Sequence, residues 1–174
     1  MRIQGDYHVH SPFCPHGTTD PLKSYIENAI QQNLVEISFT EHAPLPENFN
    51  DPTPEKDCGM TLVQTDAYIK AVEELKAEYK NDIKIHIGLE VDYIEGYEEG
   101  TRNILNTYGP YLDDSILSVH LLKAPTSEYV CLDYSSDVFG EIAQLFGSVD
   151  HVYSKYYETI KRAILSDLGT YKPN

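Results

Sequence analysis

Apolar and polar positions alternate in four short stretches of this chain, and a segment with helical spacing follows each stretch. The alternation predicts strands over residues 2–10, 35–40, 83–91 and 115–120. Apolar residues three and four positions apart predict helices over residues 21–33, 64–80 and 97–108, and a mostly helical segment over 137–168 that is broken near Gly147. Residues 171–174 are typical of the approach to a further strand. Strands and helices that alternate in this way predict an α/β fold with a parallel sheet.

Turn-forming residues mark the boundaries of these elements. Asp20 and Pro21 are expected to open the first helix, with Asp20 as the N-cap and Pro21 at the first helical position. Residues 43–58 hold four prolines and show little periodicity, so they predict a long loop. Such a loop at the end of a strand is either a wall or lid of an active site or a solvated excursion.

Each predicted strand delivers a His or Glu at its C-terminal end. His8 and His10 end the first strand, His42 follows the second, Glu90 ends the third and His120 ends the fourth. The carboxyl ends of parallel strands meet at one face. A His or Glu at the end of each of four strands therefore favours a barrel over an open sheet. Six unrelated polar residues at strand ends, His16 included, are the alternative.

The spacing of His8 and His10 places both imidazoles on one side of the strand. Their Cα atoms would lie about 6.6 Å apart, and one metal ion at about 2.0–2.1 Å from each nitrogen can bridge that gap. The two-residue spacing alone is equally compatible with chance. The chain then bends over residues 12–17, which are rich in proline and glycine, and this bend can bring His16 back toward the pair.

Strand parity separates these candidates from nearby polar residues. It favours His42 over Glu41 as the residue that shares a face with small polar neighbours. His86 is on the face of Glu90 but about 13 Å earlier along the strand, so we expect a structural role for it. His151 lies in a helical context, and we expect a structural role for it as well.

The charge balance excludes several classes of function. The chain has 13 Lys and Arg against 28 Asp and Glu, which gives a net charge of −15. This balance argues against a nucleic-acid binder and against docking on an anionic membrane. No apolar run approaches the about 20 residues of a membrane span, and the N-terminus has no apolar signal region, so we expect a cytoplasmic protein. The three Cys are odd in number and lack C-x-x-C spacing, which indicates reduced thiols.

The candidate ligands suit a transition metal. Imidazoles together with a carboxylate fit Zn, Mn or Fe better than Ca or Mg. The candidates exceed the needs of one four-coordinate site, so two or three divalent ions are expected. Paired ions about 3.5–4 Å apart can clamp the attacking and leaving oxygens of a phosphoester. The candidate metal ligands are His8, His10, His16, His42, Glu90 and His120.

Five stretches of the sequence resemble the polymerase and histidinol phosphatase (PHP) superfamily, in its monofunctional histidinol-phosphatase branch. They are D-Y-H-V-H-S-P-F-C-P-H-G at 6–17, T-E-H-A-P at 40–44, G-L-E-V-D-Y-I at 88–94, L-S-V-H at 117–120 and Y-Y-E-T-I-K-R-A-I-L-S-D-L-G at 156–169. The resemblance implies a distorted (β/α)7 barrel with a trinuclear metal centre that hydrolyses L-histidinol phosphate in histidine biosynthesis. It assigns metal binding here to the same six residues, with His42 and Glu90 as the catalytic ones.

The resemblance also sets expectations about how much of the barrel is present. Residues 1–174 correspond to a single PHP domain and to the N-terminal part of its barrel. The family continues with a strand that bears a further His and with a later Asp-x-His pair, which this chain does not reach. We therefore expect either a fragment of a longer enzyme or a chain that has lost activity and remains as a metal- or partner-binding remnant. An oligomer is compatible with either.

Two further expectations concern the substrate. Arg162 is a candidate contact for the substrate phosphate because a guanidinium matches phosphate geometry, although an Arg on the solvated surface of a helix is the alternative. The acidic loop could attract the cationic amine of L-histidinol phosphate through Glu47, Asp51, Glu55 and Asp57. Another PHP phosphoesterase or nuclease is the competing enzymatic function.

Overall fold

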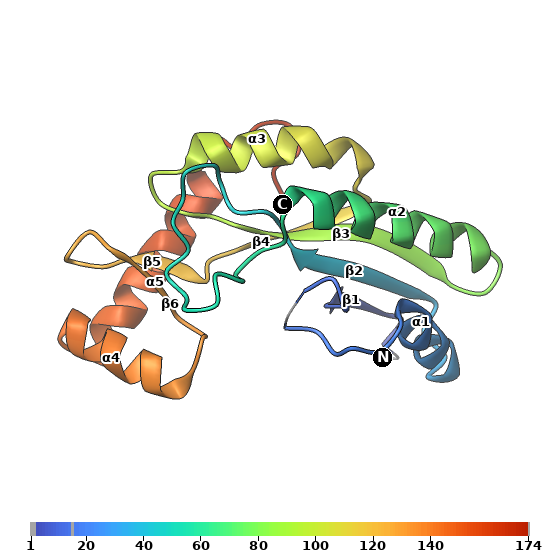
Figure 1. The fold of residues 1–174 in the computed structure, drawn as a ribbon, viewed down its shortest axis with the longest axis horizontal. Coiled ribbons are helices and arrows are strands. Elements are labelled where there is room, and N and C mark those ends of the chain that lie inside the picture. The colour runs from blue at the N-terminus through green and yellow to red at the C-terminus, as the bar shows by residue number, and fades with distance from the viewer. Residues whose placement is uncertain (1–2, 15, 174) are drawn as a thin grey trace.

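A computed structural model describes residues 3–14 and 16–173, and its centre is a parallel sheet of four strands (Figure 1). The strands follow one another in chain order as β1 (Gly5–Val9), β2 (Glu36–His42), β3 (Lys84–Asp92) and β4 (Asp114–Ser118). All three pairings between neighbours are parallel. The α/β fold expected from the alternating pattern is therefore confirmed.

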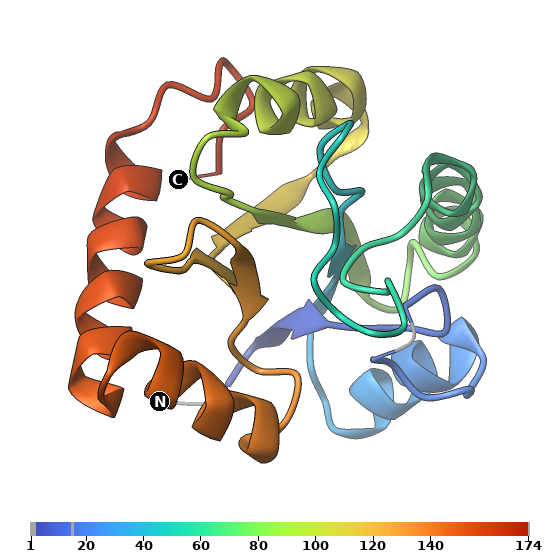
Figure 2. The same ribbon diagram turned by 60° about the vertical axis from the view of Figure 1, so that its left-hand side comes forward.

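The helices lie on both sides of this sheet. They are α1 (Leu22–Gln31), α2 (Leu62–Glu78), α3 (Glu98–Tyr108), α4 (Ser136–Phe146) and α5 (Val149–Leu165), and a short 3-10 turn (Gly109–Tyr111) follows α3. Figure 2 shows the strands as a curved arc, with α1, α2 and α3 outside it and α5 across its open side. The curvature makes this part of the chain a half-barrel, as the expected PHP-type barrel requires.

The ends of the helices follow from local chemistry. Thr61 and Gln64 form a capping box at the start of α2, in which each side chain binds the other residue's backbone N–H. Gly147 has a φ of 85° and ends α4, and the Ser148 side chain then caps α5. The predicted break in the last helical segment is therefore confirmed.

The predicted cap of the first helix is wrong. Asp20 accepts a hydrogen bond from the Thr18 hydroxyl at 2.7 Å, and the helix begins at Leu22 without a side-chain cap. Pro21 occupies the N-cap position because its ψ of 143° is extended. The short turn at Thr18 competes for the carboxylate that would otherwise cap the helix.

Alternating residues of β3 pack against α2. Ile85, Ile87 and Leu89 are at most 3% exposed, and Tyr68 and Val72 of α2 are wholly buried in the same cluster. These are the apolar positions that the strand and helix patterns predict. Their burial fixes which face of β3 is left for the polar residues, and Glu90 is on that other face.

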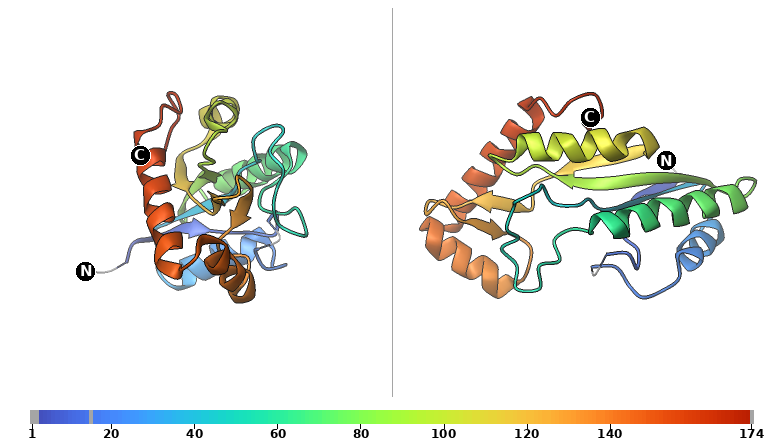
Figure 3. Two further views of the ribbon diagram at one scale, coloured as in Figure 1. Left: turned by 90° about the vertical axis from the view of Figure 1, so that its left-hand side faces the viewer. Right: turned by 45° about the horizontal axis from the view of Figure 1, so that its top comes forward.

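A hairpin follows β4 that the sequence pattern does not predict. It consists of β5 (Leu121–Lys123) and β6 (Tyr129–Cys131), which pair antiparallel. The fourth parallel strand therefore ends at Ser118, before His120, instead of continuing to it. Figure 3 shows the hairpin near the carboxyl ends of the parallel strands, beside the loop that follows β2.

That loop packs on the hairpin through a second apolar cluster. Cys58 of the loop joins Ile94, Leu121 and Cys131, which are all at most 9% exposed. The ring centroid of Phe49 lies 5.1 Å from that of Tyr97 and 5.0 Å from that of Tyr129. The loop after β2 is therefore held against the sheet end by apolar contacts.

The approach to a further strand that the sequence predicts near the C-terminus is not found among the described residues. Residues 171–173 form a turn and coil instead of the approach to a strand, and Asn174 lies outside the described residues. Over residues 3–14 and 16–173, no helix has both the length and the apolar character needed to cross a lipid bilayer.

Candidate metal centre

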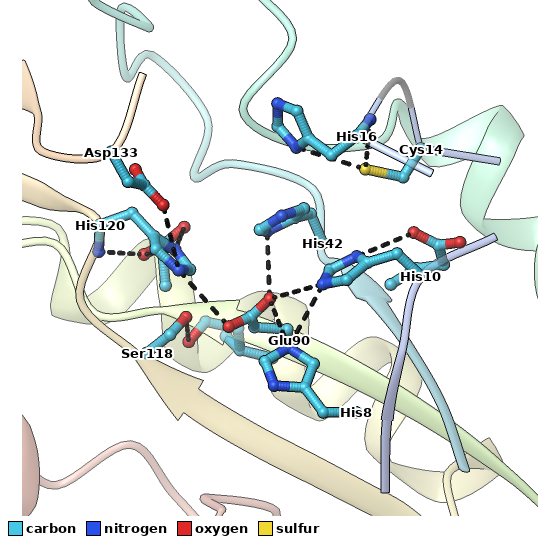
Figure 4. A network of polar contacts seen from close by, with 12 residues as sticks. His8, His10, Cys14, His16, His42, Glu90, Ser118, His120 and Asp133 are labelled. Carbon is cyan, nitrogen blue, oxygen red and sulfur yellow. Dashed lines mark hydrogen bonds and ion pairs between the residues drawn. The ribbon is translucent and has the colours of Figure 1, made fainter. Parts of the chain in front are cut away.

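Four histidines from the ends of the parallel strands converge on the carboxylate of Glu90 (Figure 4). Glu90 Oε2 lies 3.2 Å from His8 Nε2 and 3.4 Å from His10 Nε2. The same oxygen lies 3.5 Å from His42 Nδ1, and Glu90 Oε1 lies 3.5 Å from His120 Nε2. Glu90 itself is only 3% exposed. Five of the six residues that the sequence predicts thus meet at one point.

An irregularity in β1 accompanies the first two imidazoles. Asp6 is opposite Ile37 and Val9 is opposite Phe39, so β1 has one more residue than β2 over this interval. Such a bulge changes the direction of side chains and is common beside functional sites. The Nε2 atoms of His8 and His10 lie 3.2 Å apart, so both still point the same way, as strand parity predicts.

His16 lies beside the cluster on the loop after β1. Its Nδ1 is 3.4 Å from the Cys14 sulfur, and its ring centroid is 5.1 Å from that of His42. The loop turns tightly, since Gly17 N–H donates to the Cys14 carbonyl at 3.0 Å and a Cβ on Gly17 would collide with the Ser11 backbone. Pro15, which the sequence argument used for this bend, lies outside the described residues.

Asp92 is a residue of the site that sequence reasoning missed. It ends β3 two positions after Glu90, and its Oδ1 accepts hydrogen bonds from the His120 backbone N–H at 3.0 Å and from Nδ1 at 3.1 Å. Because Asp92 holds Nδ1, Nε2 of His120 is turned toward Glu90. Extending the alternation by two residues from Glu90 would have found it.

Glu41 was also missed, because parity placed it away from His42. Its carboxylate is wholly buried, and its Oε2 lies 3.5 Å from Nδ1 of His10. The loop after β1 covers that side of β2, which strand parity cannot foresee.

Two of the predicted structural histidines lie in contacts of their own. His86 Nε2 is 2.9 Å from a Glu36 carboxylate oxygen near the start of the sheet. His151 Nδ1 is 3.1 Å from the carbonyl oxygen of Phe146, where it helps the chain turn between α4 and α5. Neither side chain lines the pocket that contains Glu90.

The structure does not bring Arg162 to this cluster. Its guanidinium bonds to a Glu95 oxygen at 2.9 Å and to Glu158 at 2.5 Å. It is not among the residues that line the pocket around Glu90. The expected phosphate contact of Arg162 therefore has no counterpart in this arrangement, because two carboxylates already occupy its nitrogens.

The cluster lies in an open pocket of about 800 Å³. The loop after β2 contributes Thr53, Glu55, Asp57 and Cys58 to its wall, which confirms that this loop borders the site. The lining that the described residues form contains no Lys or Arg. The pocket is therefore a place where a cation is favoured.

The pKa values of Glu90 and His120 also show that this pocket favours positive charge. Burial opposes ionisation of Glu90, but the hydrogen bond from His10 and the neighbouring His120 and His42 lower its pKa to about 2. Burial also opposes protonation of His120, but its hydrogen bond with Asp92 raises its pKa to about 9. Glu90 is thus an anion over the whole physiological range.

The two remaining core imidazoles differ in their environments. The nearby Cys14 sulfur and the carboxylates of Glu41 and Glu90 raise the pKa of His10 to about 11. Burial lowers the pKa of His42, which favours its neutral form. A neutral imidazole is the form that binds a metal ion.

The donor atoms fit divalent ions. The described residues contain three groups of possible metal ligands, and inside each group the ligand atoms lie within 4.8 Å of one another. The groups are His8 with His10 and Glu90, His42 with Asp92 and His120, and His10 with Cys14 and His42. The buried Nδ1 atom of His42 has no hydrogen-bond partner and lies 3.5 Å from Glu90 Oε2. A bound cation would satisfy such an unpaired buried nitrogen.

Imidazoles and carboxylates at the carboxyl ends of a curved parallel sheet define an α/β half-barrel with a candidate metal centre. The chain belongs to the PHP domain family, which matches residues 6–172. It is similar to histidinol-phosphatase of Bacillus subtilis, with 49% identity over 168 residues that make up 97% of this chain and 62% of that protein. The resemblance found in the sequence motifs is thereby confirmed.

Two solved structures are similar to this fold. A candidate histidinol phosphatase from Listeria monocytogenes superposes with a TM-score of 0.90 and 37% identity, over 97% of this chain and 64% of that one. A histidinol phosphate phosphatase from Lactococcus lactis gives a TM-score of 0.55 and 30% identity, over 67% of this chain and 40% of that one. The latter is complexed with zinc, L-histidinol and phosphate. The chain thus spans less than two thirds of the length of these relatives.

Proposed function

We propose that this protein is a metal-dependent phosphomonoester hydrolase that converts L-histidinol phosphate to L-histidinol and phosphate in histidine biosynthesis. The observation that carries the proposal is the convergence of His8, His10, His42 and His120 on Glu90 in one open pocket. Similar proteins named histidinol-phosphatase, one of them complexed with zinc, L-histidinol and phosphate, support the choice of substrate.

We assign two or three divalent ions, Zn, Mn or Fe, to this pocket. His8, His10 and Glu90 would hold one ion, and the donor set of His42, Asp92 and His120 would hold a second. His16, beside His42, is the residue for a third. Bound divalent ions supply a Lewis acid that polarises phosphoryl oxygens and lowers the pKa of water.

The chain's own residues supply order and charge. Asp92 fixes the orientation of the His120 ring through Nδ1, and Glu90 holds the side chains of four strands at one point. At the rim, Glu55, Asp57 and Asp133 face the pocket and would attract the ammonium group of the substrate. Arg162 is left out of the phosphate contact because its nitrogens are bonded to other carboxylates.

A cytoplasmic location accords with this function. Cys14, Cys58 and Cys131 are all free thiols, and free thiols persist in a reducing compartment. The acidic pocket, which lacks Lys and Arg among its described lining residues, disfavours single-stranded DNA as a substrate.

The test is phosphate release by the purified protein loaded with zinc or manganese. The panel contains L-histidinol phosphate, other phosphomonoesters and single-stranded DNA. Glu90→Gln is expected to lower kcat/KM on L-histidinol phosphate by at least about 100-fold, since it removes the charge that four imidazoles share. Glu158→Gln, on the exposed side of α5, is the matched control and should leave kcat/KM unchanged. Equal turnover of every phosphomonoester would contradict the substrate, and no turnover with bound metal would favour the inactive remnant.

A further inference from the structure

Glu41 is a charged side chain without solvent exposure. It is the penultimate residue of β2, and its exposed fraction is 0%. A buried carboxylate is costly unless hydrogen bonds or a cation compensate its charge. The charge of Glu41 must therefore be compensated by groups that contact its two carboxylate oxygens.

One oxygen of Glu41 is held by the loop after β1. The backbone N–H of Ser11 donates to Glu41 Oε1 at 2.5 Å, and the Ser11 hydroxyl donates to the same oxygen. Ser11 is itself wholly buried. These bonds fix the carboxylate in one orientation and join the end of β2 to the turn that follows His10.

The other oxygen of Glu41 faces His10. Oε2 lies 3.5 Å from His10 Nδ1, and both atoms are buried without a hydrogen-bond partner. His10 is the one ion-pair partner found for Glu41 within the part of the chain that is described. The distance is just beyond that of a hydrogen bond, so a small rotation of the ring would complete it.

The second nitrogen of His10 points the opposite way. His10 Nε2 lies 3.2 Å from His8 Nε2 and 3.4 Å from Glu90 Oε2. The imidazole therefore lies between Glu41 on one side and the candidate metal donors on the other. A proton held on Nδ1 by Glu41 leaves the lone pair of Nε2 free for a metal ion.

We propose that Glu41 is the positioning residue that sets the tautomer and ring orientation of His10, so that Nε2 binds the metal. The proposal rests on the metal centre of the proposed function. The same arrangement recurs on β3, where Asp92 holds Nδ1 of His120 at 3.1 Å and Nε2 faces Glu90. Two carboxylates, from neighbouring strands, would then orient the imidazoles on the two sides of Glu90.

Cys14 offers a competing arrangement. Its sulfur falls in one group of possible ligand atoms with His10 and His42. If a metal ion were bound there, His10 could bind it through Nδ1, and Glu41 would then hold no proton on Nδ1 and would not set the tautomer of the ring. The tautomer of His10 in the zinc-loaded protein distinguishes the two arrangements.

The first experiment needs no mutation. Zinc-loaded protein with ¹⁵N-labelled histidine is studied by long-range ¹H–¹⁵N NMR, which separates a protonated nitrogen from a metal-bound one. The proposal expects His10 with a proton on Nδ1 and zinc on Nε2. Zinc on Nδ1 would overturn it. If zinc does not bind the wild-type protein at all, the metal centre of the proposed function falls, and the proposal for Glu41 falls with it.

The second experiment measures zinc affinity by competition with a chelator. Glu41→Gln keeps the shape of the side chain and is expected to weaken zinc binding by about 10–100-fold. Glu41→Asp keeps the charge and should recover part of that loss, which a purely structural role would not explain. Glu158→Gln is the control and should bind zinc as the wild type does.

A loss of structure is kept separate from a loss of positioning. Circular dichroism of each metal-free variant checks the fold, and Ser11→Ala removes one donor to Glu41 while leaving the carboxylate in place. If Glu41→Gln is folded and binds zinc with the wild-type affinity, Glu41 is not a positioning residue. In that case zinc-dependent phosphatase activity would still stand as a separate question.

Discussion

Protons and metal ions compete for the same nitrogen atoms in this site. Without metal, the pKa of His10 is raised to about 11 by Cys14, Glu41 and Glu90, and that of His120 is raised to about 9, mainly by Asp92 against the effect of burial. Both imidazoles are therefore protonated at pH 7, and a metal ion must displace those protons.

The first prediction is that zinc binding at pH 7 releases protons. Because both raised pKa values lie above pH 7, zinc affinity should increase as the pH rises toward about 9 and decrease as the pH falls. Isothermal titration calorimetry in buffers of different ionisation enthalpy measures the number of protons released. A binding enthalpy that does not depend on the buffer would show that the imidazoles are already neutral.

The second prediction concerns His16, the candidate on a loop. If His16 is a ligand, His16→Ala should lower the metal content per chain and the turnover of L-histidinol phosphate while leaving the fold in place. The tight turn around Gly17 holds the imidazole near His42, so little ordering entropy opposes binding. Elemental analysis and turnover on the same sample give the answer.

Cys14→Ser is the companion variant for His16, since the Cys14 sulfur is 3.4 Å from His16 Nδ1. Unchanged metal content and unchanged turnover in His16→Ala would remove His16 from the site. A loss in Cys14→Ser instead would transfer the role to the thiol.

At the scale of elements, the loop after β2 is built around a buried carboxylate. Asp51 is 6% exposed, and its Oδ1 accepts hydrogen bonds from Thr53 N–H at 2.8 Å and from the Thr53 hydroxyl at 2.7 Å. Its Oδ2 accepts from the Cys58 N–H at 2.9 Å. Asp51 therefore holds together the segment that forms one wall of the pocket, instead of facing a substrate.

The third prediction is that Asp51→Ala lowers the free energy of unfolding by about 1–3 kcal/mol, because it leaves buried donors unpaired. The loosened wall should also raise KM for L-histidinol phosphate more than it changes kcat. Urea denaturation and steady-state kinetics measure both quantities. Glu47 is exposed and does not line the pocket around Glu90, contrary to its expected contact with the substrate, so Glu47→Ala is the control and should change neither.

Long periodic elements could be predicted from the sequence, and short ones could not. β3 has nine residues, so its alternation is visible and places Glu90 correctly. β5 and β6 have three residues each, which is too short for a period of two to be recognised. The hairpin forms because its side chains pack on Ile94 and Cys58, and that is a tertiary contact.

The side chains of the candidate metal centre differ in how far strand parity predicts them. His8, His42 and Glu90 lie on strands whose parity predicts their direction, whereas His10 and His120 lie one and two residues beyond the ends of their strands. Asp92 would have been predicted as well if the alternation of the third strand had been extended two residues beyond Glu90. Glu41 could not be found in this way, because the loop at Ser11 buries a side of β2 that parity alone leaves open.

At the scale of the whole molecule, the half-barrel has two strand edges without a partner strand in its described sheet, at β1 and at β4. Beside β4, a groove runs toward α5 and is lined by Ile116, Tyr156, Ile160 and Ile164, among others. Ile164 is 66% exposed. Unpaired edges and apolar grooves favour association with other chains.

The fourth prediction is that residues 1–174 expressed alone associate in solution. The net charge of −15 opposes contact between copies, so association should increase when about 0.5 M salt screens that repulsion. Light scattering coupled to size exclusion measures the mass. Ile164→Lys places a charge in the groove and should shift the chain toward monomer. A monomer at every salt concentration would mean that the groove does not drive association.

The close approach of Cys58 and Cys131 has a consequence for redox conditions. Their sulfur atoms lie 4.0 Å apart, and they join the loop after β2 to the hairpin. The hydrogen bond with Cys131 and burial raise the pKa of Cys58, so the Cys58 thiol should react slowly at neutral pH. An azo oxidant such as diamide would take up the two hydrogen atoms as the disulfide forms, and Cys131→Ser should prevent this while Cys14→Ser should not.

Once closed, that bond would connect positions far apart in the sequence, and by loop entropy it would stabilise the fold by about 4 kcal/mol. Intact mass spectrometry and thermal unfolding with and without reductant would detect it. The loop after β2 that forms one wall of the pocket would then be covalently joined to the β5–β6 hairpin. In an oxidised cell the protein would be harder to unfold, and a substrate that needs the wall to move would have less room to enter.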